Sequence, residues 1–288
     1  MVTREERAYK KWLEAGISDN FIFSKTMELY PDLCKELIEK ILHIKIREIK
    51  YPEREKVLEE RLDAKGVRLD VYVEDENNRS FDIEMQIAEV DKLEKRMRYY
   101  QGLIDMDKLK HGAKYRTLGE SYIIFICLFD YFGQGRHIYT FNNRCEEDIN
   151  LRLNDGATKI FLNTEGILND SDEDLKNFLD YVAGRGVIGN FAEKINTAVQ
   201  EVKLAKKWRL DYMTFELMMQ ELEEKVFEKG LNQGIKQGIE RGIKKGLNQG
   251  TENIAKKMLN LGMSFEDICK ITELSIKRIK ELAKSIKN

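Results

Sequence analysis

The chain has 288 residues, of which 35% are charged and 42% hydrophobic, and its formal net charge is −2. From these proportions we expect neither a disordered nor a membrane-embedded protein. The length allows one large or two modest domains. Four cysteines without CxxC spacing and three dispersed histidines likewise exclude a disulfide framework and a zinc site.

The charges are unevenly distributed along the chain. From Lys225 to the end there are 14 Lys or Arg against 7 Asp or Glu, so an acidic body carries a basic tail. A basic tail favours a polyanionic partner, although a solvated Lys-rich helix surface explains the charge equally well. The charged N-terminus has no apolar signal core, and no apolar run approaches the roughly 20 residues that span a bilayer. We therefore expect a cytoplasmic protein without a membrane partner.

The first 65 residues predict three helices and a short strand. Apolar spacing indicates helices over residues 5–15 and 18–29, and Pro31 opens the third. The apolar face of the third helix consists of Leu33, Leu37, Ile38 and Ile41. Residues 44–49 suggest a short strand, and the polar stretch 51–65 is either a loop or an exposed excursion.

Residues 66–87, GVRLDVYVEDENNRSFDIEMQI, predict a β-hairpin, because two runs alternate with period two around a polar turn at residues 75–78. The residues expected to face the core are Val67, Leu69, Val71 and Val73 in the first run and Phe81, Ile83, Met85 and Ile87 in the second. A hairpin centred near Asn77 places Asp70 directly across from Glu84.

Asp70 and Glu84 are predicted to bind a divalent cation. Facing residues of a strand pair have Cβ atoms roughly 4.5–5.5 Å apart, and like charges at that distance are destabilising without a counter-ion. Carboxylates suit Mg²⁺, with Mn²⁺ and Ca²⁺ as alternatives. Met85 can offer its backbone carbonyl as a ligand, and Gln86 can orient an attacking water. Asp82, on the same face, is either a second ligand or a solvated charge. The alternative without a metal is a surface hairpin whose polar face is merely solvated.

The following residues predict a β-α-β crossover. Residues 90–109 have helical apolar spacing, and the continuous apolar run 121–129 is typical of a strand buried on both faces. A strand, a helix and a second buried strand place residues 121–129 parallel to residues 81–87.

Further elements extend the α/β domain. Residues 137–141 predict a strand, and residues 149–153 and 159–162 predict a hairpin joined through Asn154-Asp155-Gly156. Ser171, with Asp174, is expected to cap a helix. Two more helices are predicted over residues 190–208 and 211–229. The fold class is therefore α/β, a mixed-sheet core followed by an all-helical C-terminal extension.

Glycine recurs at every fourth position from Gly230 to Gly250, and an aliphatic residue follows most of these glycines. Six glycines weaken an isolated helix by roughly 5–6 kcal/mol. The array is therefore either a helix stabilised by association or a flexible tether, and we favour self-association into a homo-oligomer as a hypothesis.

Residues 251–288 predict short helices with tight turns. Expected inward positions are Ile254, Met258, Leu261, Phe265, Ile268, Ile271, Ile276, Ile279, Leu282 and Ile286, and Ser264 and Ser275 are expected caps. The outward residues Lys277, Arg278, Lys280 and Lys284 make the last helix basic. This pattern is typical of a helix-turn-helix that contacts DNA, and a small protein-interaction or oligomerisation cap is the alternative.

The chain resembles the Rpn family of recombination-promoting nucleases and transposases, which belongs to the PD-(D/E)XK nuclease superfamily. Four stretches carry this resemblance: GVRLDVYVED, FDIEMQ, KRMRYYQGLID and SYIIFICLFD. The resemblance runs from about Asp19 to the end and is looser in SDNFIFSKTM, where Ser24 separates a Phe-Lys pair. It implies a restriction-endonuclease-like mixed-sheet core and Mg²⁺-dependent DNA endonuclease activity.

The resemblance also implies roles for matching residues. Asp70 and Glu84 would bind the metal, Gln86 would occupy the position of the superfamily's lysine, and a helical carboxylate, Glu36 or Glu39, could complete the site. On a nuclease, Arg96 or Arg98 could contact phosphate. Tyr100 lies on the apolar stripe and is expected in the core.

The sequence predicts a DNA endonuclease that acts in recombination or on mobile elements. The alternatives are a DNA-binding or oligomerising protein on a nuclease-like scaffold with weak or no catalysis, and a partner-binding scaffold without affinity for DNA. The expected organisation is a nuclease domain over 1–190, a helical extension over 191–229, the glycine-repeat connector over 230–250 and the helix-turn-helix-like tail over 251–288.

Overall fold

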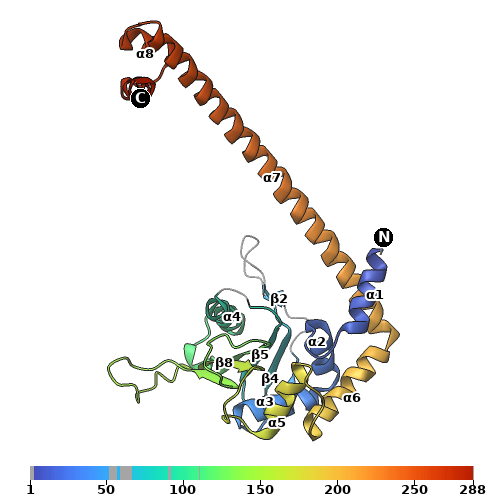
Figure 1. Ribbon diagram of the computed structural model, residues 1–288. Helices are drawn as coiled ribbons and strands as arrows, with labels where there is room; N and C mark the ends of the chain where they lie inside the picture. Colours follow the sequence, from blue (N-terminus) through green and yellow to red (C-terminus); the bar gives the residue numbers. More distant parts are fainter. Residues whose placement is uncertain (1–2, 52–56, 59–66, 90–91, 110, 288) are drawn as a thin grey trace. The chain divides into compact units, whose positions relative to one another are not determined.

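The structure is a computed structural model that describes residues 3–51, 57–58, 67–89, 92–109 and 111–287. The chain divides into two compact units, Met1–Glu216 and Leu217–Asn288. Each unit is described by itself below (Figure 1). Within the described residues, none of the helices combines the length and apolar character required to cross a membrane.

A six-stranded mixed sheet forms the centre of the first unit, in the order β1-β4-β5-β6-β8-β7. The strands are β1 (Ile49–Lys50), β4 (Val71–Asp75), β5 (Ser80–Gln86), β6 (Ser121–Cys127), β7 (Ile138–Phe141) and β8 (Ala157–Asn163). The three central strands, β5, β6 and β8, are parallel, whereas β1, β4 and β7 pair antiparallel with their neighbours. The fold class predicted from the sequence is confirmed.

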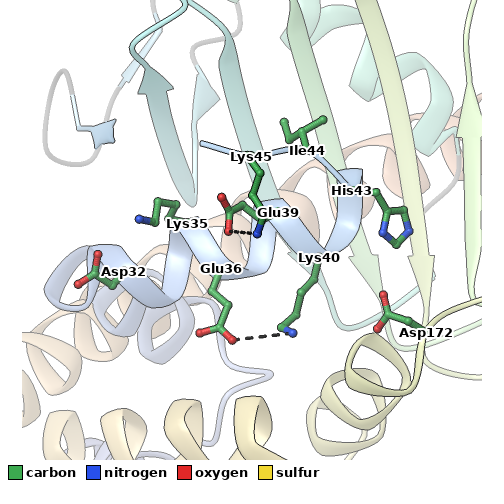
Figure 2. A pocket seen from close by; sticks show the side chains of 9 residues that line it. All are labelled: Asp32, Lys35, Glu36, Glu39, Lys40, His43, Ile44, Lys45 and Asp172. Carbon is green, nitrogen blue, oxygen red and sulfur yellow. Dashed lines mark ion pairs between the residues drawn. The ribbon is translucent and has the colours of Figure 1, made fainter. Parts of the chain in front are cut away.

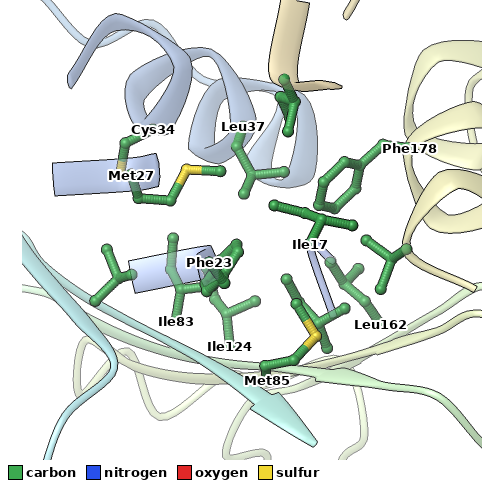
Figure 3. Packing of buried hydrophobic residues seen from close by; sticks show 14 of the residues in the cluster. Ile17, Phe23, Met27, Cys34, Leu37, Ile83, Met85, Ile124, Leu162 and Phe178 are labelled. Atoms are coloured by element: carbon green, nitrogen blue, oxygen red, sulfur yellow. The ribbon is translucent and has the colours of Figure 1, made fainter. Parts of the chain in front are cut away.

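Helices cover both faces of this sheet (Figure 1). Their bounds are α1 (Arg4–Glu14), α2 (Asn20–Leu29), α3 (Pro31–Leu42), α4 (Leu93–Lys108), α5 (Glu173–Val182) and α6 (Asn190–Leu204), with a short 3₁₀ turn, η1, at Tyr115–Thr117. One hydrophobic cluster joins α1, α2, α3, α5 and α6 to one face of the sheet (Figure 3). A second cluster joins α4 to the other face. The first unit extends past residue 190 because α6 contributes Phe191, Ile195 and Val199 to the larger cluster.

The predicted helix starts agree with the structure in most cases. Thr3 forms a capping box with Glu6, Asp19 caps α2 and Pro31 is in the first turn of α3. The cap of α5 differs from the prediction: Asp172, and not Ser171, accepts the hydrogen bond from the backbone N–H of Leu175. Both side chains can serve as caps, so the sequence alone did not separate them.

The predicted crossover is confirmed, because β5 and β6 are parallel neighbours on either side of α4 in the chain. The stripe of α4 that the sequence predicted is buried: Leu93, Met97, Tyr100 and Ile104 all belong to the second cluster. The polar side of β5 therefore faces α4.

Two strand predictions were wrong. Of residues 44–49, only Ile49 lies in a strand, β1. Residues 149–153 have an isolated bridge from Arg152 to Arg144 in place of a strand, and β8 pairs instead with β6 and β7. The apolar side chains of this stretch are 58–65% exposed: Ile149, Leu151 and Leu153. The alternating pattern there does not correspond to a strand with one buried face.

The first run of the hairpin is divided by a bend at Asp70. β3 (Val67–Arg68) pairs with β2 (Val57–Leu58) in a separate two-stranded sheet, and β4 starts at Val71. Because of the bend, Leu69 lies in the cluster beside α4, whereas Val71 lies in the cluster on the other face of the sheet. The prediction that both side chains face the same way was therefore wrong. Ile87, expected in the core, lies beyond the end of β5 and is 56% exposed. The stretch 51–65 lies mostly outside the described residues.

The second unit contains the greater part of α7 (Lys206–Asn260), together with α8 (Phe265–Thr272) and α9 (Ile276–Lys287). The glycine array lies entirely within α7 and is helical. Four buried residues hold the end of α7 against α8 and α9: Ala255, Ile268, Ile279 and Leu282. Ser264 and Ser275 accept hydrogen bonds from backbone N–H groups of α8 and α9, as predicted.

Several tail positions predicted to face inward are exposed. Ile254, Leu261, Ile271, Ile276 and Ile286 are between 38% and 81% exposed. Met258 packs against the small core as predicted, and Ala255 and Leu259 take the places expected for Ile254 and Leu261. The prediction for the last turns of α7 was therefore wrong at two of three positions, because alanine was not counted as a core residue.

Candidate functional site

The hairpin has the predicted register. Val71 pairs with Ile83 and Val73 with Phe81, which centres the hairpin on Asn77. Asp75 closes the turn, since its Oδ1 accepts hydrogen bonds from the backbone N–H groups of Asn77 and Arg79. The same register brings the residue before β4, Asp70, beside Glu84.

Asp70 and Glu84 are directly linked through the backbone of the hairpin. The backbone N–H of Asp70 donates to Oε1 of Glu84 at 2.9 Å, and Oδ2 of Asp70 accepts from the backbone N–H of Met85 at 3.1 Å. Oδ2 of Asp70 also accepts from Nδ2 of Asn20, at 3.1 Å. The two carboxylates predicted to bind metal are therefore brought together, as expected.

Asn20 is a site residue that the sequence did not indicate. It is the first residue of α2, directly after the capping Asp19, and it reaches Asp70 from the layer of helices on the other side of the hairpin. Its contact depends on how α2 packs against β4 and β5, and no spacing in the sequence reports that packing.

The polar row of β5 is deeply buried against α4. Ser80, Asp82, Glu84 and Gln86 are at most 4% exposed, because α4 covers the face to which alternate residues of β5 point. Asp82 is completely buried, and neither of its carboxylate oxygens has a hydrogen-bond partner among the described residues. Of its two predicted alternatives, a solvated charge is wrong.

Arg96 joins this row from the first turns of α4. Its Nη2 lies 2.9 Å from Oε2 of Glu84, and its Nη1 donates to Oε1 of Gln86 at 2.9 Å. Its Nε donates to the hydroxyl of Tyr100 at 2.7 Å, and the guanidinium lies over the rings of Tyr100 and Phe125. The sequence suggested Arg96 as a phosphate contact, whereas the structure places it among the carboxylates.

Burial and mutual repulsion raise the pKa values of these carboxyl groups. The pKa of Glu84 is raised to about 8, first by burial and then by the charge of Asp70, with the Asp70 N–H and Arg96 acting in the opposite direction. The pKa of Asp82 is raised well above its usual value by burial and by the charges of Glu84 and Asp70. One guanidinium therefore does not compensate the three carboxylates.

Glu36 and Glu39 do not complete this cluster. Both lie on α3, which packs on the opposite face of the sheet from α4. They line a separate charged pocket together with Lys40 and Asp172 (Figure 2). Glu36 pairs there with Lys40 and Lys194, and Oε1 of Glu39 accepts from the backbone N–H of Ile46.

The remaining predicted residues lie outside the cluster. Arg98 is exposed on α4, and the lysines at 277, 280 and 284 lie on α9 of the second unit. Arg278 is engaged within that unit, since its Nε lies 2.7 Å from Glu252 and its Nη1 lies 3.0 Å from Glu281.

The donor set available for a metal is oxygen-rich. Among the described residues, no three His, Cys, Asp or Glu side chains are grouped so that they could hold an ion. The candidate donors are therefore two carboxylates, Asp70 and Glu84, with the backbone carbonyl of Met85. Cys34 and Cys127 are buried, and burial raises the pKa of each thiol to about 12, so neither favours a thiolate ligand or nucleophile.

A comparison with protein families finds that residues 21–181 match the model described as PD-(D/E)XK nuclease family transposase. The matched range contains the hairpin, α4 and the parallel strands. Neither a search of curated proteins nor a search of solved structures finds a match.

Proposed function

The chain belongs to the PD-(D/E)XK nuclease family transposases, and from this premise we propose that it is a metal-dependent DNA endonuclease that acts in recombination or on mobile elements. The observation that supports the proposal best is the hairpin register, which brings Asp70 against Glu84 with Gln86 on the same face. These are the three residues to which the resemblance in sequence assigns the family's motif.

The residues of the cluster fit a hard divalent cation. Half-buried Asp70 lies against buried Glu84, and Asp82, buried on the same strand face, keeps both oxygens without a hydrogen-bond partner among the described residues. Such a cluster is destabilising unless positive charge is added. We assign Asp70, Glu84 and the carbonyl of Met85 as ligands of Mg²⁺, with Mn²⁺ or Ca²⁺ as alternatives and Asp82 as accessory donor. When bound, such a cation polarises a phosphoryl oxygen and lowers the pKa of water.

The protein's own groups would position the reactants. Gln86 lies beside Glu84 on β5, and its amide is held with Oε1 toward Arg96. We assign to Gln86, held in this position, the role of orienting the attacking water. Arg96 supplies the positive charge that a lysine brings to the superfamily motif and that Gln86 lacks, since its guanidinium contacts both Glu84 and Gln86.

We assign the DNA contacts to basic residues outside the cluster. Arg98 lies on α4, two residues after Arg96, and the lysines of α9 are Lys277, Lys280 and Lys284. α8 and α9 are joined by a three-residue turn whose first residue, Glu273, has a left-handed backbone (φ 58°), and a turn of this length is typical of a helix-turn-helix. Arg278, the fourth basic residue of α9 predicted to contact DNA, is paired with Glu252 and Glu281 within the same unit.

The second candidate function is a DNA-binding or oligomerising protein with weak or no catalysis on the same scaffold. The observation that favours it is the ion pair between Glu84 and Arg96, which occupies one oxygen of a required ligand. Metal binding separates the two candidates.

The separating experiment is a calorimetric titration of the full chain with Mn²⁺. We expect one binding site that Asp70→Ala weakens by at least tenfold, while Asp32→Ala, a change on the exposed side of α3, leaves the affinity unchanged. Absence of Mn²⁺ binding, or binding that Asp70→Ala does not change, would overturn the nuclease assignment in favour of the second candidate.

A further inference from the structure

A row of large apolar side chains runs along α7 without cover. Its members are spaced by four residues and are each 52–71% exposed: Phe227, Leu231, Ile235, Ile239, Ile243 and Leu247. None of them belongs to the small core that α7 forms with α8 and α9. Soluble monomers rarely expose a contiguous apolar surface of this kind, so we expect the row to be an interaction surface.

A row of glycines runs beside it. The six members, Gly230, Gly234, Gly238, Gly242, Gly246 and Gly250, recur with the same spacing of four residues. A Cβ added at any of these glycines would meet nothing within 4 Å apart from the helix itself, and none has the positive φ that would require glycine. Each glycine costs a helix about 1 kcal/mol relative to alanine. Their presence is therefore not explained by packing or backbone geometry inside the described chain.

The two rows are complementary to each other. Residues four apart form a ridge on a helix surface, and the line of glycines forms a groove beside that ridge. A second helix with the same pattern can place its aliphatic ridge in this groove while its own groove receives the first ridge. A surface that carries both parts fits a copy of itself about a two-fold axis, whereas an unrelated partner would need the same spacing independently.

The charges lie away from this surface. Lys236, Glu240, Arg241, Lys244 and Lys245 occupy the third and fourth positions of the repeats, which point away from the aliphatic residue of the same repeat. Residues 225–250 contain six Lys or Arg and two Glu. Two copies therefore repel each other weakly along the rim, and salt screens this repulsion.

We propose that the ridge and groove of α7, residues 227–250, form a homodimer interface that takes a second copy of this chain. A repeat of four residues exceeds the 3.6 of the α-helix, so the two helices cross in the right-handed sense, at about −40° to −50°. Two helices that cross at this angle touch over a few turns, so the contact centres on Ile235, Ile239 and Ile243 of each copy and buries less than the roughly 1,200 Å² of a standard interface. The dimer is accordingly reversible and depends on protein concentration.

The first test is the mass of the full chain by sedimentation equilibrium, after nucleic acid has been removed. We expect twice the monomer mass of 33.8 kDa at high protein concentration, with a larger dimer fraction in about 0.5 M than in about 0.05 M NaCl. Ile239→Glu, on the ridge, weakens association at least tenfold. Gln237→Glu, which adds the same charge on the polar side, leaves association unchanged.

The second test replaces three glycines of the groove together, Gly234→Ala, Gly238→Ala and Gly242→Ala. Alanine favours the helix, so more helical circular dichroism is retained on heating than in the wild type. The added methyl groups obstruct the ridge of the partner, so association decreases at the same time. More helix with unchanged association would overturn the role of the glycine row as the groove that receives the partner's ridge.

Three further results would overturn the proposal. They are a monomeric wild-type chain at high protein and salt concentration, a dimer that Ile239→Glu does not weaken, and association that appears only when DNA or lipid vesicles are added. Because the readout is mass and not cleavage, the dimer and the nuclease assignment can fail independently of each other.

Discussion

Nη2 of Arg96 lies 2.9 Å from Oε2 of Glu84, a residue that is 1% exposed. The same guanidinium reaches Gln86, so one cation from α4 spans both polar residues of the Glu-x-Gln motif. The contact gives the site a fixed positive charge on a neighbouring element, and Arg96 is accordingly a positioning residue for Glu84.

We expect Arg96→Gln to lower the cleavage rate by about 10–100-fold, the range found when a group that orients a metal ligand is removed. Arg96→Lys restores only part of the rate, because an ammonium cannot contact Glu84 and Gln86 with two fixed N–H groups. Mn²⁺ affinity measured by calorimetry changes in the same variants, which a role in phosphate binding alone would not produce. Lys95→Gln, on the exposed side of α4, is the matched control. Wild-type cleavage and Mn²⁺ affinity in Arg96→Gln would contradict this role.

The raised pKa values of Glu84 and Asp82 predict how stability depends on pH. The pKa of Glu84 rises from about 4.5 in the unfolded chain to about 8 in the folded protein, so between these values the folded protein binds more protons. The free energy of unfolding of the metal-free protein therefore decreases as pH rises through this window, on the order of 1–3 kcal/mol. Thermal melts in EDTA across this window measure the decrease.

Asp82→Asn tests the same electrostatic account. Removing the fully buried one of three neighbouring carboxylates raises the melting temperature of the metal-free protein in the upper half of the window, with little effect at its acid end. Asp32→Asn, on the exposed side of α3, is the control for a change of net charge. A melting temperature that is independent of pH in EDTA, or one that Asp82→Asn lowers near the pKa of about 8 for Glu84, would contradict the repulsion described.

The lysines of α9 are expected to contribute to DNA affinity through phosphate. The combined variant Lys277→Gln, Lys280→Gln and Lys284→Gln should bind duplex DNA more weakly, and the slope of log K against log salt should decrease by about 1 for each phosphate that is no longer neutralised. Lys257→Gln on α7 serves as the control in a fluorescence anisotropy titration over a range of NaCl concentrations. An unchanged slope would assign the tail to protein interaction.

The sequence was sufficient for the parts of the site that depend on local pattern. Alternation and the polar turn predict the register of β4 and β5, and the crossover through α4 follows from the order of elements. Leu69 was assigned to the wrong face because one bent residue, Asp70, reverses the alternation. A period-two pattern cannot indicate where such a bend occurs.

The contacts made by distant elements could not be predicted in the same way. Asn20 and Arg96 reach the carboxylates only because α2 and α4 pack on opposite faces of the sheet. Glu36 and Glu39 are correctly placed on a helix by the sequence, but the packing of α3 directs them to another pocket (Figure 2). Tertiary packing decides which helical side chain completes a site, and spacing along the chain does not report it.

The central claim, that Asp70 and Glu84 form a metal-dependent nuclease site, is tested most directly by cleavage of supercoiled plasmid in Mg²⁺, Mn²⁺ or EDTA. The wild-type chain is compared with Asp70→Ala, Glu84→Ala and the control Asp32→Ala, each purified in the same way. We expect nicking or linearisation that requires the metal, that is unchanged in Asp32→Ala and that falls by about 100-fold or more in both site variants. Equal cleavage by wild type and both site variants, or no cleavage with any metal, would contradict the claim.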